Sequence, residues 1–309
     1  MEELNKTMVK EFILVGFSDL HHYQILFLIA ILLMYITSVA GNFAVIILVK
    51  TGLSLHCPMY YFICVFAALE ISFVSVTVPR LLANMIVSNK KISFVGCFVQ
   101  LYIFSVLGIT ECFLLAVMAF DRDLAINHPL RYSSVMNHLC VFLLVVTPFI
   151  ISCIITLFPT IFTADLKFCG PNEINHFFCE LTSVQKLACS NTFISKILTS
   201  VATTFASLIP FILIIGFYIH IIITITKIKS VEGKHKAFST CSSHIIVACL
   251  FYSTVIIVYI NPQGSQYDKF LTLMYTVIVP MLNPFIYTLR NNDVKKVFLT
   301  TMLNKFKYC

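Results

Sequence analysis

The sequence predicts an all-α membrane protein, a seven-transmembrane helix bundle with a short amphipathic C-terminal helix. Hydrophobic residues make up 59% of the 309 residues and charged residues only 11%, whereas a soluble domain carries about 25% charged residues. The apolar residues gather in seven stretches, and each is long enough to cross a bilayer as a helix of ~20 residues. These stretches cover residues 24–49, 59–87, 97–120, 139–164, 197–226, 237–267 and 270–289.

The seven stretches nearly fill the chain, so we expect a single membrane domain over residues 1–309. It divides into an outer tail at residues 1–23, the helix bundle at residues 24–289 and an inner tail at residues 290–309. A large soluble core is the alternative, and the regular spacing of the stretches argues against it. The N-terminus has no basic segment followed by a short apolar run and a cleavage site, so the first helix is expected to act as an uncleaved anchor.

Within the inner tail, apolar and basic side chains alternate near helical spacing. Val294, Val297, Phe298 and Met302 lie at positions that share one helical face, with lysines between them. This pattern predicts a short amphipathic helix on the inner membrane surface. A frayed basic tail is the alternative.

The basic residues indicate how the chain is oriented. With the N-terminus outside, the segments 50–57, 121–138, 227–236 and 290–309 face the cytoplasm and carry a formal charge of +8, against +1 for the outer segments. Excess Lys and Arg on the cytoplasmic side is the usual pattern in membrane proteins. The net charge of +7 therefore indicates orientation, and not nucleic-acid binding.

Two features of the outer segments fit a secreted environment. Asn5 begins an Asn-Lys-Thr sequence, which is a glycosylation acceptor pattern that also occurs by chance. Cys97, Cys169, Cys179 and Cys189 all fall outside, so they predict two disulfides, with three possible connectivities. The other eight cysteines lie in spans or on the inner side, where free thiols are expected.

Glu70 and Glu111 are the acidic residues within the seven stretches. Two ionised, unpaired carboxylates in a dry bundle would be costly, so one is expected to be protonated or a cation to lie between them. A buried acid in a membrane helix is by default a candidate functional residue. Acid catalysis or a proton relay is the alternative, but no metal-ligand or nucleophile cluster accompanies the pair.

Six short motifs occur in order along the chain. They are Gly-Asn at residues 41–42, Pro-Met-Tyr-Tyr-Phe at 58–62, Met-Ala-Phe-Asp-Arg at 118–122, His-Pro-Leu-Arg-Tyr at 128–132, Lys-Ala-Phe-Ser-Thr-Cys-Ser-Ser-His at 236–244 and Pro-Met-Leu-Asn-Pro-Phe-Ile-Tyr at 280–287. The set resembles the vertebrate olfactory receptors, a branch of the rhodopsin-like G-protein-coupled receptors, over about residues 12–298. Asn-Pro-x-x-Tyr alone indicates only the wider superfamily, whereas the blocks at 118–132 and 236–244 are typical of the olfactory branch.

The resemblance implies that Asp121 and Arg122 form a resting-state lock that opens for the G protein; an ordinary interfacial ion pair is the alternative. The chain departs from the family at Asp123, where Tyr is usual, and at Asn127, where Cys is usual. Arg122 is thus flanked by two carboxylates, and Asp123 either tightens the lock or hampers coupling. The residues that the resemblance assigns to activation and G-protein coupling are Asp121, Arg122, Tyr218, Tyr252, Pro284 and Tyr287.

Three further sites follow from the resemblance. It places Glu70 and Glu111 with Asn283 in the sodium pocket of the superfamily, with Na⁺ as the possible bound ion and no other cofactor expected. It pairs Cys97 with Cys179 and Cys169 with Cys189. His176 begins a His-x-x-Cys-acid motif that resembles a proposed copper site, but an oxidised Cys179 is a poor ligand. His176 is therefore a weak metal candidate and is expected on the surface of the lid, the segment at residues 165–196.

The ligand site is expected among the outer halves of the third, fifth, sixth and seventh helices, under the lid. Helix packing is the alternative role for each side chain taken singly. Projection of the family's pocket gives Phe104, Ser105, Gly108, Ile109, Ala202, Thr203, Ala206, Val255, Ile256, Tyr259, Leu273 and Thr276. The set is uncharged, which predicts a small, neutral, mainly apolar ligand.

Together these features predict an odorant receptor in the plasma membrane that has no enzymatic activity. A small volatile ligand binds outside, and a heterotrimeric stimulatory G protein inside raises cAMP; membrane lipid is the remaining partner. One alternative is a rhodopsin-like receptor for a non-odorant metabolite, which expression pattern would distinguish. The other is a membrane transporter or channel, which would need polar residues continuing through the bundle.

Overall fold

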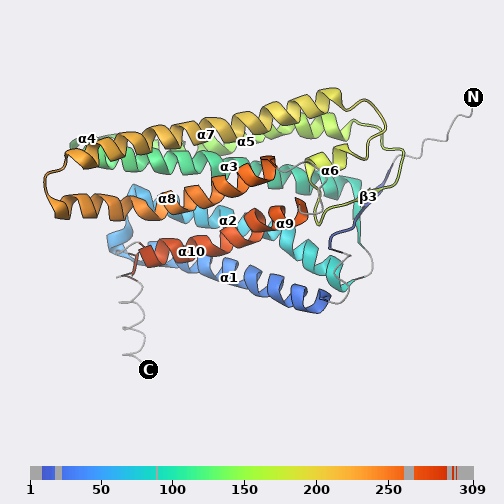
Figure 1. Ribbon diagram of the computed structural model, residues 1–309, viewed down its shortest axis with the longest axis horizontal. Coiled ribbons are helices and arrows are strands. Elements are labelled where there is room, and N and C mark those ends of the chain that lie inside the picture. The colour runs from blue at the N-terminus through green and yellow to red at the C-terminus, as the bar shows by residue number, and fades with distance from the viewer. Residues whose placement is uncertain are drawn as a thin grey trace, which may run out of the picture.

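The computed structural model describes residues 9–17, 23–87, 90–260, 268–290, 294, 295 and 297. Its long helices lie side by side along one axis (Figure 1). The first five are α1 (Gln24–Thr51), α2 (Pro58–Ile86), α3 (Phe94–Asn127), α5 (His138–Ala164) and α7 (Phe193–Lys227). They are followed by α8 (Val231–Ile260) and by a last span in three parts, α9 (Asp268–Leu273), the π-helical η2 (Met274–Ile278) and α10 (Val279–Arg290).

The helices confirm the predicted fold class. Six of the described helices are long and apolar enough to cross a membrane, and α8 contains a shorter apolar stretch, Cys241–Ile257. α3 and α7 extend past the predicted spans to 34 and 35 residues. Two short helices, η1 (Leu53–Leu55) and α4 (Pro129–Val135), lie in the connections. The predicted C-terminal amphipathic helix falls mostly outside the described residues, although Val294 is buried in the main core.

Apolar side chains are divided between an interior and an outer belt. The main core contains Phe62 and Phe66 of α2, Leu114 and Leu115 of α3, and Val247 of α8. Other large apolar side chains of α1, α5 and α7 are exposed. A helix in hydrocarbon satisfies its own backbone groups, so exposed apolar faces are stable against lipid.

A close approach of two helices explains one glycine. A Cβ added at Gly41 of α1 would lie 3.0 Å from Cγ of Pro284 on α10. Asn42 Nδ2, one residue further on, donates to the Pro280 carbonyl at 3.2 Å and to the Ser38 carbonyl at 3.0 Å. The Gly-Asn pair therefore fastens the first span to the last.

The N-terminal segment forms part of a small sheet over one end of the bundle, which we call the lid end (Figure 1). Strand β1 (Glu11–Leu14) lies between β2 (Lys91–Ser93), which is antiparallel to it, and β3 (Glu173–Ile174), which is parallel. Its alternating pattern buries Phe12 and Leu14. The sequence did not predict this sheet, because β1 lies in a segment expected to be only a tail.

One disulfide and side-chain amide hydrogen bonds hold the lid to the helices, and a second disulfide closes a loop within the lid. Cys97 bonds Cys179, and Cys169 bonds Cys189, as the resemblance implied. Gln100 Oε1 accepts from the Cys179 amide at 3.1 Å. The lid contains a short helix, α6 (Leu181–Gln185), and Gln185 Nε2 at its end donates to hydroxyls on α5 and α7 at 3.0 and 2.9 Å. The lid is thus a fixed cover.

After β1 the chain turns under the lid. Gly16 has φ of +60°, a region that favours glycine. Its N–H donates to the His176 carbonyl at 3.0 Å, and its own carbonyl accepts from Lys269 Nζ at 2.7 Å. This turn joins the N-terminal segment both to the lid and to α9.

Candidate functional site

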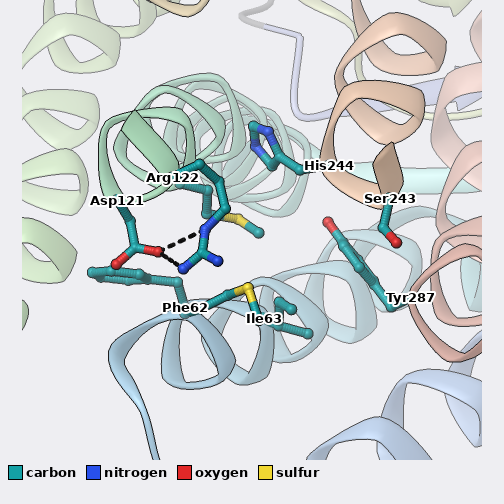
Figure 2. A pocket seen from close by; sticks show the side chains of 9 residues that line it. Phe62, Ile63, Asp121, Arg122, Ser243, His244 and Tyr287 are labelled. Carbon is teal, nitrogen blue, oxygen red and sulfur yellow. Dashed lines mark hydrogen bonds and ion pairs between the residues drawn. The ribbon is translucent and has the colours of Figure 1, made fainter. Parts of the chain in front are cut away.

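A small cavity lies between α2, α3, α8 and α10, toward the end of the bundle where α4 lies, which we call the α4 end (Figure 2). Its volume is about 20 Å³, enough for about one water molecule. The side formed by α2 is apolar, whereas α3 contributes two charged groups and α8 and α10 contribute hydroxyl and imidazole groups. The lining residues are Met59, Phe62, Ile63, Met118, Asp121, Arg122, Ser243, His244 and Tyr287.

Arg122 is buried at this cavity and pairs with its neighbour. Its Nε donates to Asp121 Oδ2 at 2.9 Å, and its Nη2 bonds the same oxygen. Tyr132 of α4 donates its hydroxyl to Asp121 Oδ1 at 2.7 Å. Both carboxylate oxygens therefore have partners, as a buried ion pair requires. The predicted Asp121–Arg122 pair is present, and α4 takes part in it.

Asp123 points away from this pair. Its Oδ1 accepts from Asn127 Nδ2 at 2.6 Å and lies 2.8 Å from Nδ1 of His220 on α7. Among the described contacts, Arg122 bonds Asp121 and not Asp123. Asp123 therefore forms a contact between α3 and α7 and not one with Arg122, and its effect on coupling stays a prediction.

Of the remaining residues assigned to activation, Tyr287 lines the cavity and Tyr218 contacts a residue of its wall. Tyr218 of α7 bonds Nδ1 of His244, which lines the cavity. The Tyr252 ring lies tilted against Phe211 at 5.0 Å between ring centroids, and Tyr287 meets Phe66 edge-on at 6.3 Å. His244 stood in the quoted motif at residues 236–244 but was not singled out, because sequence gave no sign of its partner.

The two buried acids lie deeper in the bundle. Glu70 and Glu111 are 1% and 2% exposed, and Asn283 Nδ2 donates to Glu70 Oε1. Within the described chain, Glu70 Oε2, Glu111 Oε1 and Asn283 Oδ1 are buried without a hydrogen-bond partner. Three buried acceptor oxygens without donors suit a bound cation or a protonated carboxyl group. The residues present therefore fit a small hard cation such as Na⁺.

The predicted ligand residues on α3 lie beneath a cluster of aromatic rings. Phe104 stacks on Phe73 of α2 at 4.7 Å and lies 4.4 Å from Phe178 of the lid, measured between centroids. A Cβ at Gly108 would make an ordinary contact with Phe73 at 3.5 Å. The lid end of α3 is thus covered by aromatic rings.

The other predicted ligand residues have varied surroundings. Val255 packs against the main core, whereas Ile256 is 42% exposed. Leu273 packs against residues of α1, α2 and the lid. Ser105, Ile109 and Ala202 are partly buried and Ala206 is buried. The side chain of Tyr259 lies outside the described part of the structure.

Two hydroxyls of the predicted set already donate hydrogen bonds. Thr203 Oγ1 donates to the Thr199 carbonyl at 2.6 Å, and Thr276 Oγ1 donates to the Thr272 carbonyl at 2.8 Å. Each hydroxyl has one hydrogen and two lone pairs. Both oxygens therefore keep acceptor capacity; Thr203 is partly buried and Thr276 is buried.

The sequence missed two aromatic residues at this site. Phe178 lies over Phe104, and the Tyr275 ring lies 6.4 Å from both Phe104 and Phe73. Tyr275 lies within the π-helical η2, where the wider turn changes which residues face the interior. Regular helical spacing cannot find such a residue, whereas Phe178 could have been suggested by its position beside Cys179.

His176 is buried in the lid and not on its surface, contrary to expectation. It is 3% exposed, and its ring stacks on Phe177 at 4.7 Å and meets Phe178 edge-on at 4.6 Å. Burial lowers the pKa of His176 to about 4, against opposing effects from Glu180 and Asp268. The Cys179 sulfur is bonded to Cys97, so it cannot serve as a thiolate ligand with His176.

Glu180 lies beside His176 and caps α6. Its carboxylate accepts from the Thr182 and Ser183 amides at 3.1 and 2.7 Å. Burial opposes ionisation, but His176 and these hydrogen bonds together lower the pKa of Glu180 below its usual value. The carboxylate is therefore committed to the lid structure.

Comparison with known proteins gives a consistent result. A family profile described as Olfactory receptor matches residues 31–305. Olfactory receptor 10C1 of Homo sapiens is 44% identical over 301 residues, which is 96% of each chain. Olfactory receptor 5G26 of Mus musculus is 41% identical over 311 residues, covering 100% of this chain and 98% of the relative. The crystal structure of squid rhodopsin superposes with a TM-score of 0.71 at 18% identity, over 88% of this chain and 79% of that one.

The helix bundle and its likeness to rhodopsin define the fold of a G-protein-coupled receptor. The family match and the relatives specify the branch: the chain belongs to the olfactory receptor family. It is therefore a multi-pass plasma-membrane receptor and not an enzyme. Family membership implies a small-molecule ligand and a G-protein partner.

Proposed function

We propose that this receptor binds a small, neutral, mainly apolar volatile molecule at the lid end and activates a stimulatory G protein at the α4 end, which raises cAMP. Family membership supports the odorant role. The observation that supports the ligand class is the ring cluster of Phe73, Phe104, Phe178 and Tyr275. Aromatic surfaces gain most from apolar contact, and a buried ionic ligand without a counter-charge would be costly.

The hydroxyls favour one kind of polar group on the ligand. Thr203 and Thr276 donate to their own helices, so each accepts a hydrogen from a ligand without losing a bond. A ketone or ester would need a donor, and it would have to displace an intrahelical bond. We therefore expect alcohols to be preferred over matched ketones or ethers by about fivefold, for one hydrogen bond worth ~1 kcal/mol.

Affinity must come mainly from apolar contact, at ~25 cal/mol per Å² buried. A small volatile molecule offers little area, so we expect micromolar potency.

The test is a cAMP-reporter screen of volatile compounds in cells expressing the receptor, followed by an alcohol and its methyl ether of equal chain length. Thr203→Val and Thr276→Val should each weaken the alcohol about fivefold and leave the ether nearly unchanged. Thr204→Val is the matched control, because Thr204 is exposed on the same helix. Best agonists that are carboxylic acids or amines would overturn the ligand class.

On the coupling side, the proposal gives Asp121 and Arg122 the role of a lock, with Tyr218, Tyr252, Pro284 and Tyr287 positioned around it. The buried pair and the cavity beside it support this role. Arg122→Ala should abolish agonist-stimulated cAMP at equal surface expression. A full response in that variant would remove the lock from the proposal.

The proposal also gives Glu70, Glu111 and Asn283 the role of holding Na⁺ within the bundle. The three buried oxygens without donors support it. Sodium would balance the carboxylate charge and stabilise the resting arrangement. Thermal unfolding of the purified receptor in NaCl and in N-methylglucamine chloride tests it, and equal melting temperatures would contradict it.

The orientation follows from charge. The excess of Lys and Arg in the segments at the α4 end supports a cytoplasmic α4 end and an extracellular N-terminus with a glycan on Asn5. An N-terminal epitope should be detected on intact cells, and Asn5→Gln should remove a glycosidase-sensitive gel shift. An epitope that is seen only after permeabilisation would reverse the orientation.

A further inference from the structure

The two side chains at which this receptor departs from the olfactory pattern contact each other. Asn127 Nδ2 donates to Asp123 Oδ1 at 2.6 Å, and the two residues lie one helical turn apart on α3. Both also reach Nδ1 of His220 on α7, at 2.8 Å from Asp123 Oδ1 and 3.0 Å from Asn127 Nδ2. The departures therefore form one three-residue group, which we call the α3–α7 bridge.

The chemistry of the bridge depends on the hydrogen of His220. An ionised carboxylate only accepts hydrogen bonds, so the contact between Asp123 and His220 requires the hydrogen to be on Nδ1. The nearby negative charge favours that tautomer. With the hydrogen on Nδ1, Asn127 Nδ2 does not bond His220; it donates to the Asp123 carboxylate and so holds Asp123 in place for His220.

Burial makes the bridge more than a surface contact. The Asp123 side chain is 11% exposed, whereas His220 is 53% exposed. A mostly buried carboxylate that loses its partner pays the cost of desolvation without compensation. Separation of α7 from α3 at this level would remove His220 and leave Asn127 as the partner of Asp123, so the bridge favours the packed arrangement.

The position of the bridge connects it to the candidate coupling site. Asp123 follows Arg122 directly in the chain, and Tyr218, two residues before His220, bonds His244 in the cavity wall. A shift of α7 would therefore displace Tyr218 from His244 and break the α3–α7 bridge at the same time. Tyr218 and His220 lie on the same segment of α7.

We propose that the α3–α7 bridge is an autoinhibitory contact, in which Asp123 and His220, positioned by Asn127, hold α7 against α3 and keep basal signalling low. The proposal rests on the coupling role given above to the α4 end. It assigns one function to Asp123, Asn127 and His220 together.

The experiment measures basal nucleotide exchange by the purified receptor in lipid nanodiscs, with a panel of G proteins from several classes. Asp123→Ala and His220→Ala should each raise basal exchange by about fivefold, the effect of losing ~1 kcal/mol. The double variant should match the single ones, because each change removes the same bond. Ile219→Ala is the matched control, since Ile219 is exposed on the neighbouring position of α7.

A charge exchange tests the bond itself. Asp123→His combined with His220→Asp should return basal exchange toward the wild-type value, which a merely structural role would not produce. Asn127→Ala should raise exchange by a smaller factor, because Asn127 positions the carboxylate. Unchanged basal exchange in both single variants, or strictly additive effects in the double variant, would overturn the proposal.

The experiment distinguishes an error in the proposed G-protein coupling from an error in the proposed α3–α7 bridge. If exchange occurs on another class of G protein, only the stimulatory assignment is wrong, and the same variants still test the bridge. If no G protein responds, the double-mutant cycle is read from thermal unfolding instead. Coupling between Asp123 and His220 in unfolding supports the bridge, and additivity there refutes it.

Discussion

Protonation of His176 should loosen the lid as the pH falls. Its pKa is lowered from 6.5 to about 4 by burial, so the unfolded lid binds a proton more readily than the folded one. The stabilising contribution is therefore fully present above pH 6.5 and is lost as the pH falls toward 4. Linkage between these two pKa values gives a loss of about 2 kcal/mol at pH 5 and ~3 kcal/mol below pH 4.

The assay is thermal unfolding of the purified receptor in nanodiscs between pH 7.5 and 5. This range stays above the region where Glu180, whose pKa is also lowered, takes up a proton. His176→Phe keeps the stacking on Phe177 and should flatten most of the pH dependence. His138→Phe is the control, because His138 is exposed at the start of α5. An equal pH slope in wild type and His176→Phe would refute a buried neutral imidazole.

Two other predictions concern the lid and the buried acids. Cys97→Ser and Cys179→Ser should each abolish surface expression, because their disulfide fastens the lid to α3. Cys169→Ser should have a milder effect, because it opens only a loop within the lid. Antibody staining of intact cells measures all three variants, and normal staining of Cys97→Ser would contradict this reasoning. Glu70→Gln and Glu111→Gln should each change basal signalling or sodium sensitivity, and the double variant should be non-additive if they share one site; strictly additive effects would show two independent sites.

The spans were predictable because a bilayer imposes a length and a composition on every helix that crosses it. The motif resemblance also implied which cysteines pair. Contacts that depend on three-dimensional neighbours were not predictable in this way. Asp123 adjoins Arg122 in the sequence, but in the structure it contacts His220, 97 positions away.

Two local features of the backbone also escaped prediction. Strand β1 is too short for its alternation to be distinguished from an irregular tail, and its partners lie far along the chain. The π-helical turn in the last span brings Tyr275 toward Phe104. Regular periodicity assumes an unbroken helix, so a residue that depends on an irregular turn is not found by it.

The sheet over the lid end also sets an order for biosynthesis. β1 is synthesised first, yet its partners are residues 91–93 and 173–174, so it can pair fully only after four spans have left the ribosome. Cys179 is likewise synthesised 82 residues after its partner Cys97, whereas Cys189 follows Cys169 by 20 residues. A contact that closes a long loop forms late, because the chain loses conformational entropy before the contact stabilises it. The completed sheet therefore marks a chain in which the first four spans have placed these three segments on the same side of the membrane.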